Sequence, residues 1–368
     1  DAMTEQELEK ALRTAAEADV AVIFAGLPEI FESEGYDRTS MKLPQCQDRL
    51  IEEVLKVQPN VVVVLHNGSP VELPWADKVS AILEMYLGGQ GVGEACDWLL
   101  YGEANPSGRL AETFPYRLED NPSYLHFPGN GKRVLYGEDI FVGYRYYDTK
   151  KVPVRYAFGH GLSYTEFAYE DLNLSSAQMT DEDILTVSFK VKNTGKTEGK
   201  EVVQLYVKDC TSSAIRPEKE LKGFEKVFLN PGETKTVTME LDKRSFAWYN
   251  TELHDWFAAS GEYKLLVGTS SRDIHLEGRI HLNSSQELPM HVHMNTTLGE
   301  LFRNPKTSET AKELTAKYIS AMNVGEESSS EAASEAITEE MTEAMTDSMP
   351  LRALVSFGGY FREELTEI

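Results

Sequence analysis

The N-terminal part of the chain alternates between two hydrophobic patterns. Leucine and alanine recur at helical spacing among charged residues, and short, purely apolar runs follow such stretches. The first pattern is typical of amphipathic helices and the second of buried strands. We predict helices over residues 4–18, 44–57 and 92–101, and strands over 20–25, 61–65 and 80–87. Strands that alternate with helices in this way indicate parallel βαβ units.

A different pattern begins near residue 184, where apolar and polar residues alternate one by one. This period of two is typical of strands with one buried face. Glycine, proline and asparagine separate the segments, for example in the turn at 193–195. We predict strands over 185–191, 202–207, 221–227, 234–241 and 261–268. Short strands at this spacing indicate a β-sandwich.

The C-terminal tail has three parts with different patterns. Residues 298–321 are helix-like, and residues 350–355 restart an apolar pattern that we expect to dock on a domain. Between them, residues 326–347 carry eight acidic residues and no lysine or arginine. This acidic stretch is poor in large apolar groups, so we predict a solvated, mobile linker. The tail is therefore predicted to be acidic and partly helical.

Composition narrows the classes of function. The 368 residues carry a net charge of −24, which argues against nucleic acid or an anionic membrane as a partner. The sequence contains no run of 18 apolar residues, so it predicts no membrane span. Cys46, Cys96 and Cys210 are far apart and lack metal-binding spacing, which indicates structural thiols and no metal site.

The strongest candidate for chemistry is an acidic loop. Residues 32–38 read Glu-Ser-Glu-Gly-Tyr-Asp-Arg and come after the strand predicted over 20–25. In open α/β sheets, ligands bind in the crevice beyond the carboxyl ends of the strands. These carboxylates are therefore predicted to lie at a ligand-binding or active site. The alternative is a solvated surface loop in which Asp37 and Arg38 pair.

A glycine-rich turn at residues 88–93 also follows a predicted strand and opens a predicted helix. Such a turn can bind phosphate, which would make the domain a flavodoxin-like nucleotide-binding module. The turn lacks the Lys-Ser/Thr pair of a P-loop, and its glycines do not have the GxGxxG spacing. We therefore favour a structural strand-to-helix turn.

Five segments together resemble glycoside hydrolase family 3, the β-glucosidase group. They are residues 31–44, which contain the acidic loop, the glycines at 88–91, the segment 100–110 together with 113–115, and the segments 141–148 and 158–165. The last of these, Phe-Gly-His-Gly-Leu-Ser-Tyr-Thr, is very specific. The resemblance covers roughly residues 17–168, and residues 169–280 resemble the fibronectin-III-like domain that follows in many members.

The resemblance implies an α/β fold with a parallel sheet, then an all-β sandwich, then the tail. We place the C-terminal part of the family's α/β sandwich domain at 1–168, the fibronectin-III-like domain at 169–282 and a C-terminal extension at 283–368. The family's TIM barrel, which carries the nucleophilic aspartate, has no counterpart in this pattern of elements. We therefore interpret the chain as the C-terminal portion of a larger enzyme, and we expect it to hydrolyse glycosides poorly by itself.

The resemblance also implies roles for residues of the acidic loop. The family's acid/base glutamate precedes glycine and an aromatic residue, which is the place of Glu34, and Glu32 is the second candidate. Phe31, Tyr36 and Arg38 are candidates for contact with the sugar. The expected partners are a β-linked glucoside or related oligosaccharide and the TIM-barrel portion of the same enzyme, with no cofactor and no metal. A non-catalytic carbohydrate-binding or structural fragment stays open as the alternative.

Overall fold

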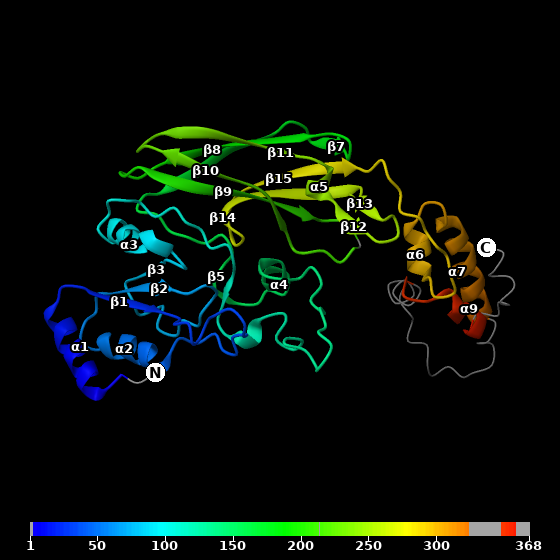
Figure 1. Cartoon of the computed structure of the whole chain (residues 1–368). Coiled ribbons are helices and arrows are strands. Elements are labelled where there is room, and N and C mark those ends of the chain that lie inside the picture. The colour runs from blue at the N-terminus through cyan, green and yellow to red at the C-terminus, as the bar shows by residue number, and fades with distance from the viewer. Residues whose placement is uncertain (1–2, 213, 324–346, 358–368) are drawn as a thin grey trace, which may run out of the picture. The chain divides into compact units, whose positions relative to one another are not determined.

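The chain divides into two compact units, one from Asp1 to Glu287 and one from Leu288 to Ile368. The computed structural model describes residues 3–212, 214–323 and 347–357. The first unit holds an α/β portion and a β-sandwich, and the described part of the second unit is helical (Figure 1).

A three-stranded parallel sheet forms the centre of the α/β portion. Its strands, in spatial order, are β1 (Ala21–Gly26), β2 (Val61–His66) and β3 (Ala81–Glu84). The helices that alternate with them are α1 (Glu5–Glu17), α2 (Gln45–Val54) and α3 (Val92–Leu100). Both strand pairs are parallel, as the βαβ alternation predicts. Strand β3 is shorter than predicted, and Tyr86, two residues beyond its end, has a φ of 48° that breaks the extended backbone.

The core of this portion lies between the sheet and the helices α1 and α2. Val61 and Leu65 of β2 are buried and belong to one cluster with Ile51 of α2 and with Trp75. Trp75 also donates its indole N–H to Asp48 Oδ1 at 2.8 Å, so the polar atom of this buried ring is satisfied. Removal of these apolar side chains from water stabilises the sheet and holds its strand ends in place.

An irregular segment connects α3 to the sandwich. It contains the short elements β4 (Phe114–Pro115), η2 (Leu118–Asp120), α4 (Tyr144–Thr149) and β5 (Val154–Tyr156), while the 3₁₀ turn η1 (Gly89–Gly91) comes just before α3. Strands β4 and β5 pair antiparallel. Residues between 112 and 147 lie against the loops that follow β1 and β2, where both line one cavity.

Two sheets form the β-sandwich (Figure 1). The larger has the order β10-β9-β14-β15-β7 and the smaller β11-β8-β6. Their strands are β6 (Phe167–Leu174), β7 (Gln178–Thr180), β8 (Leu185–Asn193), β9 (Gly199–Asp209), β10 (Glu220–Leu229), β11 (Thr234–Leu241), β14 (Gly261–Ser270) and β15 (Asp273–Asn283). Helix α5 (Lys243–Phe246) and the hairpin β12 (Trp248–Asn250) with β13 (Asp255–Phe257) lie between β11 and β14. The five predicted strands are present, and β6, β7 and β15 add to them.

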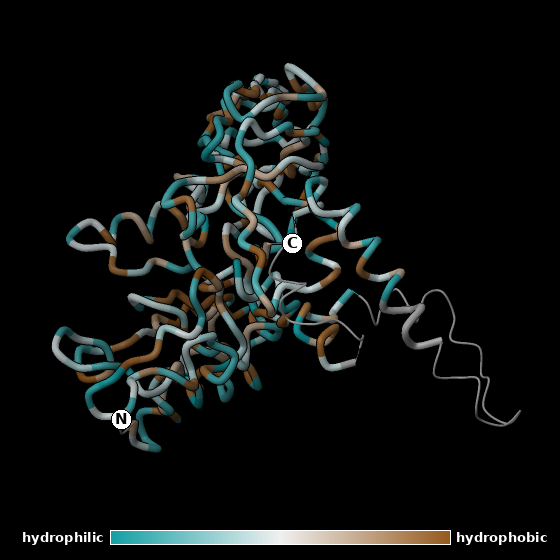
Figure 2. The backbone as a smooth tube through the Cα atoms, turned by 90° about the vertical axis from the view of Figure 1, so that its right-hand side faces the viewer, coloured by the Kyte–Doolittle hydropathy of each residue, from teal (hydrophilic) through white to brown (hydrophobic). Residues whose placement is uncertain are grey.

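Alternation of side chains builds the sandwich core. In β8, Leu185, Val187, Phe189 and Val191 are buried, and the residues between them are more exposed. Figure 2 shows short apolar and polar stretches that follow one another along the backbone. One buried face per strand is the arrangement that a period of two predicts.

Two ion pairs join the α/β portion to the sandwich, and both side chains of the first pair are buried. Arg109 donates to Glu201 of β9 at 2.9 Å, and the two side chains are 7% and 3% exposed. Asp148 of α4 accepts from Arg272 at 2.6 Å. Separation of the two portions would leave a buried charge without its partner, which is strongly destabilising. These pairs therefore hold the two portions together as one unit.

The second unit contains α6 (Leu298–Arg303), α7 (Ser308–Asn323) and α9 (Leu351–Phe357). The helix predicted over 298–321 is thus two helices, because Pro305 cannot continue an α-helix and Thr307 donates its hydroxyl to the Leu301 carbonyl at 2.7 Å. The expected docking of residues 350–355 is confirmed, since Leu351 and Leu354 share a core with α6 and α7. The predicted linker at 326–347 lies outside the described residues, except for Asp347.

No helix in the described ranges combines the length and the apolar character that a membrane span requires. In the same part of the chain, no three His, Cys, Asp or Glu side chains converge as metal ligands would. Cys46, Cys96 and Cys210 form no disulfide.

Candidate functional site

The loops that follow β1, β2 and β3 meet at one edge of the sheet. Because the three strands are parallel, all three loops leave from the carboxyl edge. Gln47 of α2 accepts the Gly26 N–H at 2.9 Å and donates to the Gly26 carbonyl at 2.9 Å. This pair of bonds fixes the end of β1, from which the chain continues into the acidic loop at 32–38.

Glu32 fastens the acidic loop to the loop after β2. Its Oε2 accepts the backbone N–H of Gly68 at 2.6 Å, and its Oε1 accepts the Ser69 hydroxyl at 2.9 Å. Arg38 Nη1 lies 3.5 Å from the same Oε1 and donates to Ser69 Oγ at 2.5 Å. A Cβ at Gly68 would come within 3.1 Å of the Glu32 carboxylate, so glycine suits this close approach. Both oxygens of Glu32 are therefore occupied.

Glu34 lies on the same loop but, unlike Glu32, has an unanchored side chain. It is exposed, and its carboxylate forms no hydrogen bond or ion pair with any residue of the described ranges. Gly35 beside it has a φ of 94°, which side-chain-bearing residues rarely adopt. The loop thus turns sharply after Glu34 and leaves this carboxylate free.

Phe31 and Tyr36 flank the acidic cluster. Phe31 is half-buried, and Tyr36 is 49% exposed. The Tyr36 hydroxyl donates to the backbone carbonyl of Glu29, which closes the loop across its base. Stacking of these two rings on a sugar stays a prediction.

Arg38 pairs with Glu32 rather than with Asp37. Its guanidinium also donates to the Pro70 carbonyl at 3.4 Å, whereas Asp37 is exposed. Burial lowers the pKa of Arg38, and the nearby Glu32 carboxylate opposes this shift. The predicted Asp37–Arg38 pair is therefore wrong, because the chain turns Arg38 inward toward the loop after β2. Contact of Arg38 with a sugar stays a prediction.

Two carboxylates that the sequence analysis missed lie near this anchor. Glu84, at the end of β3, accepts from Asn67 Nδ2 at 3.2 Å and from the Tyr86 N–H at 2.9 Å. Burial raises the pKa of Glu84 to about 7, and the charges of Glu112 and Glu32 add to the shift. Burial likewise raises the pKa of Glu112. The sequence offered one signal for Glu84, which is an acidic residue at the end of an apolar strand. It offered no such signal for Glu112.

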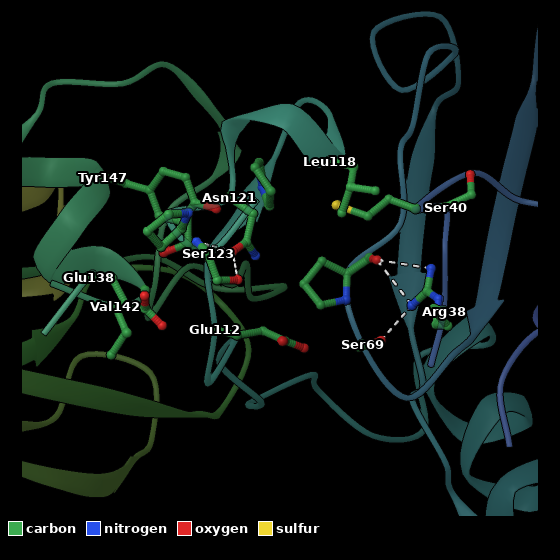
Figure 3. A pocket seen from close by; sticks show the side chains of 16 residues that line it. Arg38, Ser40, Ser69, Glu112, Leu118, Asn121, Ser123, Glu138, Val142 and Tyr147 are labelled. Atoms are coloured by element: carbon green, nitrogen blue, oxygen red, sulfur yellow. Dashed lines mark hydrogen bonds between the residues drawn. The ribbon is translucent and has the colours of Figure 1, made fainter. Parts of the chain in front are cut away.

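A cavity of about 350 Å³ opens beside Arg38. Arg38 and Ser69, from the loops after β1 and β2, stand on one side of it, and Ser123 and Glu138 of the irregular segment stand on the other (Figure 3). Glu112 lies between these two sides. The residues that anchor the acidic loop thus also form a wall of this cavity.

Comparison with protein families assigns both portions of the first unit. Residues 2–164 match the glycosyl hydrolase family 3 C-terminal domain, and residues 201–271 match the fibronectin type III-like domain. The chain belongs to glycosyl hydrolase family 3. The resemblance of the five segments is thereby confirmed, and the acidic loop of this family 3 chain falls inside the matched C-terminal domain.

Similar proteins are named β-glucosidases. Thermostable beta-glucosidase B of Acetivibrio thermocellus is 50% identical over 368 residues, which is 100% of this family 3 chain and 48% of the relative. The crystal structure of a family 3 β-glucosidase from Bifidobacterium adolescentis superimposes with a TM-score of 0.78 at 41% identity, over 84% of this chain and 46% of that chain. The Kluyveromyces marxianus β-glucosidase in complex with glucose gives 0.73 at 43% identity, over 77% and 34%. The chain therefore spans less than half the length of these relatives.

Proposed function

We propose that this chain forms the acid/base half of a retaining β-glucosidase. The nucleophile would come from a TIM-barrel portion, since the described residues contain sheets of two, three and five strands and no eight-stranded barrel. The observation that carries the proposal is one free glutamate, Glu34, on a loop that a second glutamate, Glu32, anchors.

Retaining glycosidases use two carboxyl groups about 5–5.5 Å apart. One attacks the anomeric carbon, while the other donates its proton to the oxygen of the departing aglycone. The second group then takes a proton from the water that cleaves the glycosyl-enzyme intermediate. A group with both tasks must reach the substrate and the water in turn.

Glu34 meets this requirement and Glu32 does not. The Gly68 N–H and the Ser69 hydroxyl occupy the two oxygens of Glu32. A carboxylate that is held by both of its oxygens cannot turn to the aglycone oxygen and then to the water. We therefore assign proton transfer to Glu34 and positioning of the loop to Glu32.

The proposed substrate is a β-linked glucoside or a related oligosaccharide. The similar proteins carry the name β-glucosidase, and one of the structures contains glucose. Phe31 and Tyr36 would offer apolar ring surface to the sugar, and Arg38 would offer donors to its hydroxyl groups.

The test is a fusion of this chain to the barrel portion of thermostable beta-glucosidase B, the relative that aligns with all 368 residues. Hydrolysis of an aryl β-glucoside is measured for the chain alone, for the fusion and for unmodified β-glucosidase B as the control. We expect turnover by the fusion and little or none by the chain alone, because no other group replaces the nucleophile of the covalent step.

Two outcomes would contradict the proposal. Robust turnover by the purified chain alone would show that the barrel portion is not needed. A folded fusion that binds sugar without turnover would favour the non-catalytic, carbohydrate-binding alternative.

A further inference from the structure

A chain of hydrogen bonds connects Glu84 to the acidic loop through the loop after β2. Asn67, the residue that follows β2, is fully buried. Its side-chain Nδ2 donates to the Ser69 carbonyl at 3.0 Å and to Glu84 Oε2 at 3.2 Å. Ser69 in turn donates its hydroxyl to Glu32 Oε1. The position of the residue that holds Glu32 therefore depends on which side-chain atom Asn67 presents.

The other polar atom of the Asn67 side chain is left unpaired. Within the described residues, Asn67 Oδ1 is buried and has no hydrogen-bond partner. The two hydrogens on Nδ2 meet two acceptors instead, the Ser69 carbonyl and the Glu84 carboxylate. An ionised carboxylate can only accept hydrogen bonds, so it selects the nitrogen of the amide. The orientation of Asn67 thus follows from the charge on Glu84.

A proton on Glu84 would have to reside on Oε2. The other oxygen, Oε1, accepts the backbone N–H of Tyr86 at 2.9 Å, and a backbone N–H can only donate. The Asn67 amide can instead rotate by half a turn and offer its oxygen. A protonated Oε2 would then donate to Asn67 Oδ1, the atom that has no partner while Glu84 is ionised.

Rotation of the Asn67 amide would remove the donor from the Ser69 carbonyl. That carbonyl would then face an oxygen, and two acceptors at hydrogen-bond distance repel each other. Ser69 and its neighbour Gly68 supply the two short hydrogen bonds to Glu32, at 2.9 and 2.6 Å. A shift of these two residues would weaken the contact that fastens the acidic loop.

The surroundings of Glu84 bring its protonation into the neutral pH range. Burial raises its pKa to about 7, and the like charges of Glu112 and Glu32 act in the same direction. Arg38 lies in the same group of charges, 3.5 Å from Glu32, and opposes the rise in the pKa of Glu112. Burial raises the pKa of the Tyr86 phenol, so this group stays neutral here. Glu84 is therefore the group of this cluster that is expected to titrate near pH 7.

We propose that Glu84 and Asn67 are positioning residues that fasten the acidic loop, and that the loop loosens when Glu84 takes up a proton. In the ionised state, Asn67 holds the loop after β2, and that loop holds Glu32. Uptake of one proton turns the Asn67 amide and weakens this contact. The contacts belong to this chain alone, and only their effect on turnover rests on the proposed function.

The experiment follows the Gly68 backbone N–H of the 368-residue chain, because this group donates to Glu32. Its protection against amide exchange, relative to the intrinsic rate at each pH, is measured by NMR from about pH 5.5 to about pH 8.5. We expect protection to fall by about three- to tenfold on acidification, which is the effect of one lost hydrogen bond. The midpoint of this change should lie at about pH 7, where Glu84 titrates.

Two variants separate this effect from a general loss of structure. Glu84→Gln places an N–H₂ group where the protonated acid would carry its hydrogen, so protection of Gly68 should be low at every pH. Removal of the buried charge stabilises the fold at alkaline pH, so a destabilised fold cannot explain the lower protection. Asn67→Leu removes the shared donor and should also give low protection without a pH dependence. If Asn67→Leu unfolds, Glu84→Gln decides the question.

Glu94→Gln is the matched control, because Glu94 is exposed on α3. It should reproduce the pH profile of the unmodified chain. In a fusion with the barrel portion that turns over, Glu84→Gln should lower kcat at alkaline pH by about three- to tenfold and leave KM unchanged, because a misplaced proton donor slows chemistry rather than binding.

Any of four results would overturn the proposal. Protection of Gly68 that does not change with pH would exclude the effect of Glu84, and a midpoint below about pH 6 would assign it to another carboxylate. A Glu84→Gln variant with the profile of the unmodified chain would exclude the rotation of Asn67, and an unchanged kcat in an active fusion would exclude the positioning role. The exchange measurements need no barrel, so their failure leaves the test of the fusion unaffected, and an inactive fusion leaves them valid.

Discussion

Glu32 and Glu34 stand two residues apart, yet their surroundings differ completely. Gly68 brings its backbone N–H to 2.6 Å from Glu32, and Ser69 donates to the other oxygen. Glu34 lies before the sharp turn at Gly35 and is exposed. The motif predicts that a carboxylate in this loop carries chemistry, and this role stays a prediction. The motif could not predict which of the two the loop after β2 would hold, because that contact joins residues far apart in the chain.

Glu84 makes stability depend on pH. Burial raises its pKa from the ordinary 4.5 to about 7, so the folded chain binds a proton more tightly than the unfolded chain. The resulting penalty is fully present above pH 7 and is relieved as the pH falls toward 4.5. Glu84→Gln should therefore raise the free energy of unfolding by about 1–3 kcal/mol at alkaline pH, with the gain fading on acidification.

The measurement is urea unfolding of the Glu84→Gln variant and the unmodified chain across this pH range. Glu94→Gln, at an exposed position of α3, is the control and should track the unmodified chain at every pH. An equal offset between Glu84→Gln and the unmodified chain at all pH values would refute the burial of a charged Glu84.

Most helices and strands could be predicted because their hydrophobic period is local. The period of 3.6 marks α1 to α3, and the period of two marks β8 to β11 and β14. β15 also alternates, with Ile274, Leu276, Ile280 and Leu282 on one face. The residues between them are mostly charged or polar, a composition that is also typical of surface loops, so this strand was not predicted. In β6 the φ of 56° at Asp171 shifts the register and hides the alternation.

The contact between the α/β portion and the sandwich depends on the buried Arg109–Glu201 ion pair. Arg109→Met leaves Glu201 charged and unpaired at 3% exposure, so we expect a loss of about 3–5 kcal/mol in the free energy of unfolding. Arg109→Met combined with Glu201→Met should recover much of this loss, because it removes both charges from the interior. Urea unfolding of the three proteins measures both effects.

An exposed pair provides the comparison. Lys190 and Asp171 lie 2.7 Å apart with side chains 46% and 62% exposed, so Lys190→Met should cost about 1 kcal/mol or less. If Arg109→Met lowers the free energy of unfolding no more than Lys190→Met does, the Arg109–Glu201 pair does not stabilise the contact between the α/β portion and the sandwich.

The whole chain spans less than half of its named relatives, and in the proposed function it supplies one side of the active site. The acidic loop could be found from the sequence, because its residues are contiguous and follow an apolar strand. Glu112, Glu138 and Tyr147 could not, because only the tertiary fold brings the irregular segment against the loops after β1 and β2. In the proposed function, this chain performs the proton transfer and a barrel portion performs the nucleophilic attack.

The decisive measurement compares Glu34→Ala with Glu32→Ala in the fusion with the barrel portion of beta-glucosidase B. Rates are determined on a series of aryl β-glucosides with leaving groups of graded pKa, with and without azide. Glu34→Ala should lose roughly 10²–10⁴-fold on poor leaving groups and less on acidic phenols, because only the former need the donated proton. Azide should restore turnover of the activated substrates and yield a β-glycosyl azide, while Glu32→Ala keeps the leaving-group dependence of the unmodified fusion. A steep dependence with azide rescue in Glu32→Ala, and an unchanged dependence in Glu34→Ala, would contradict the assignment of Glu34 as the proton donor.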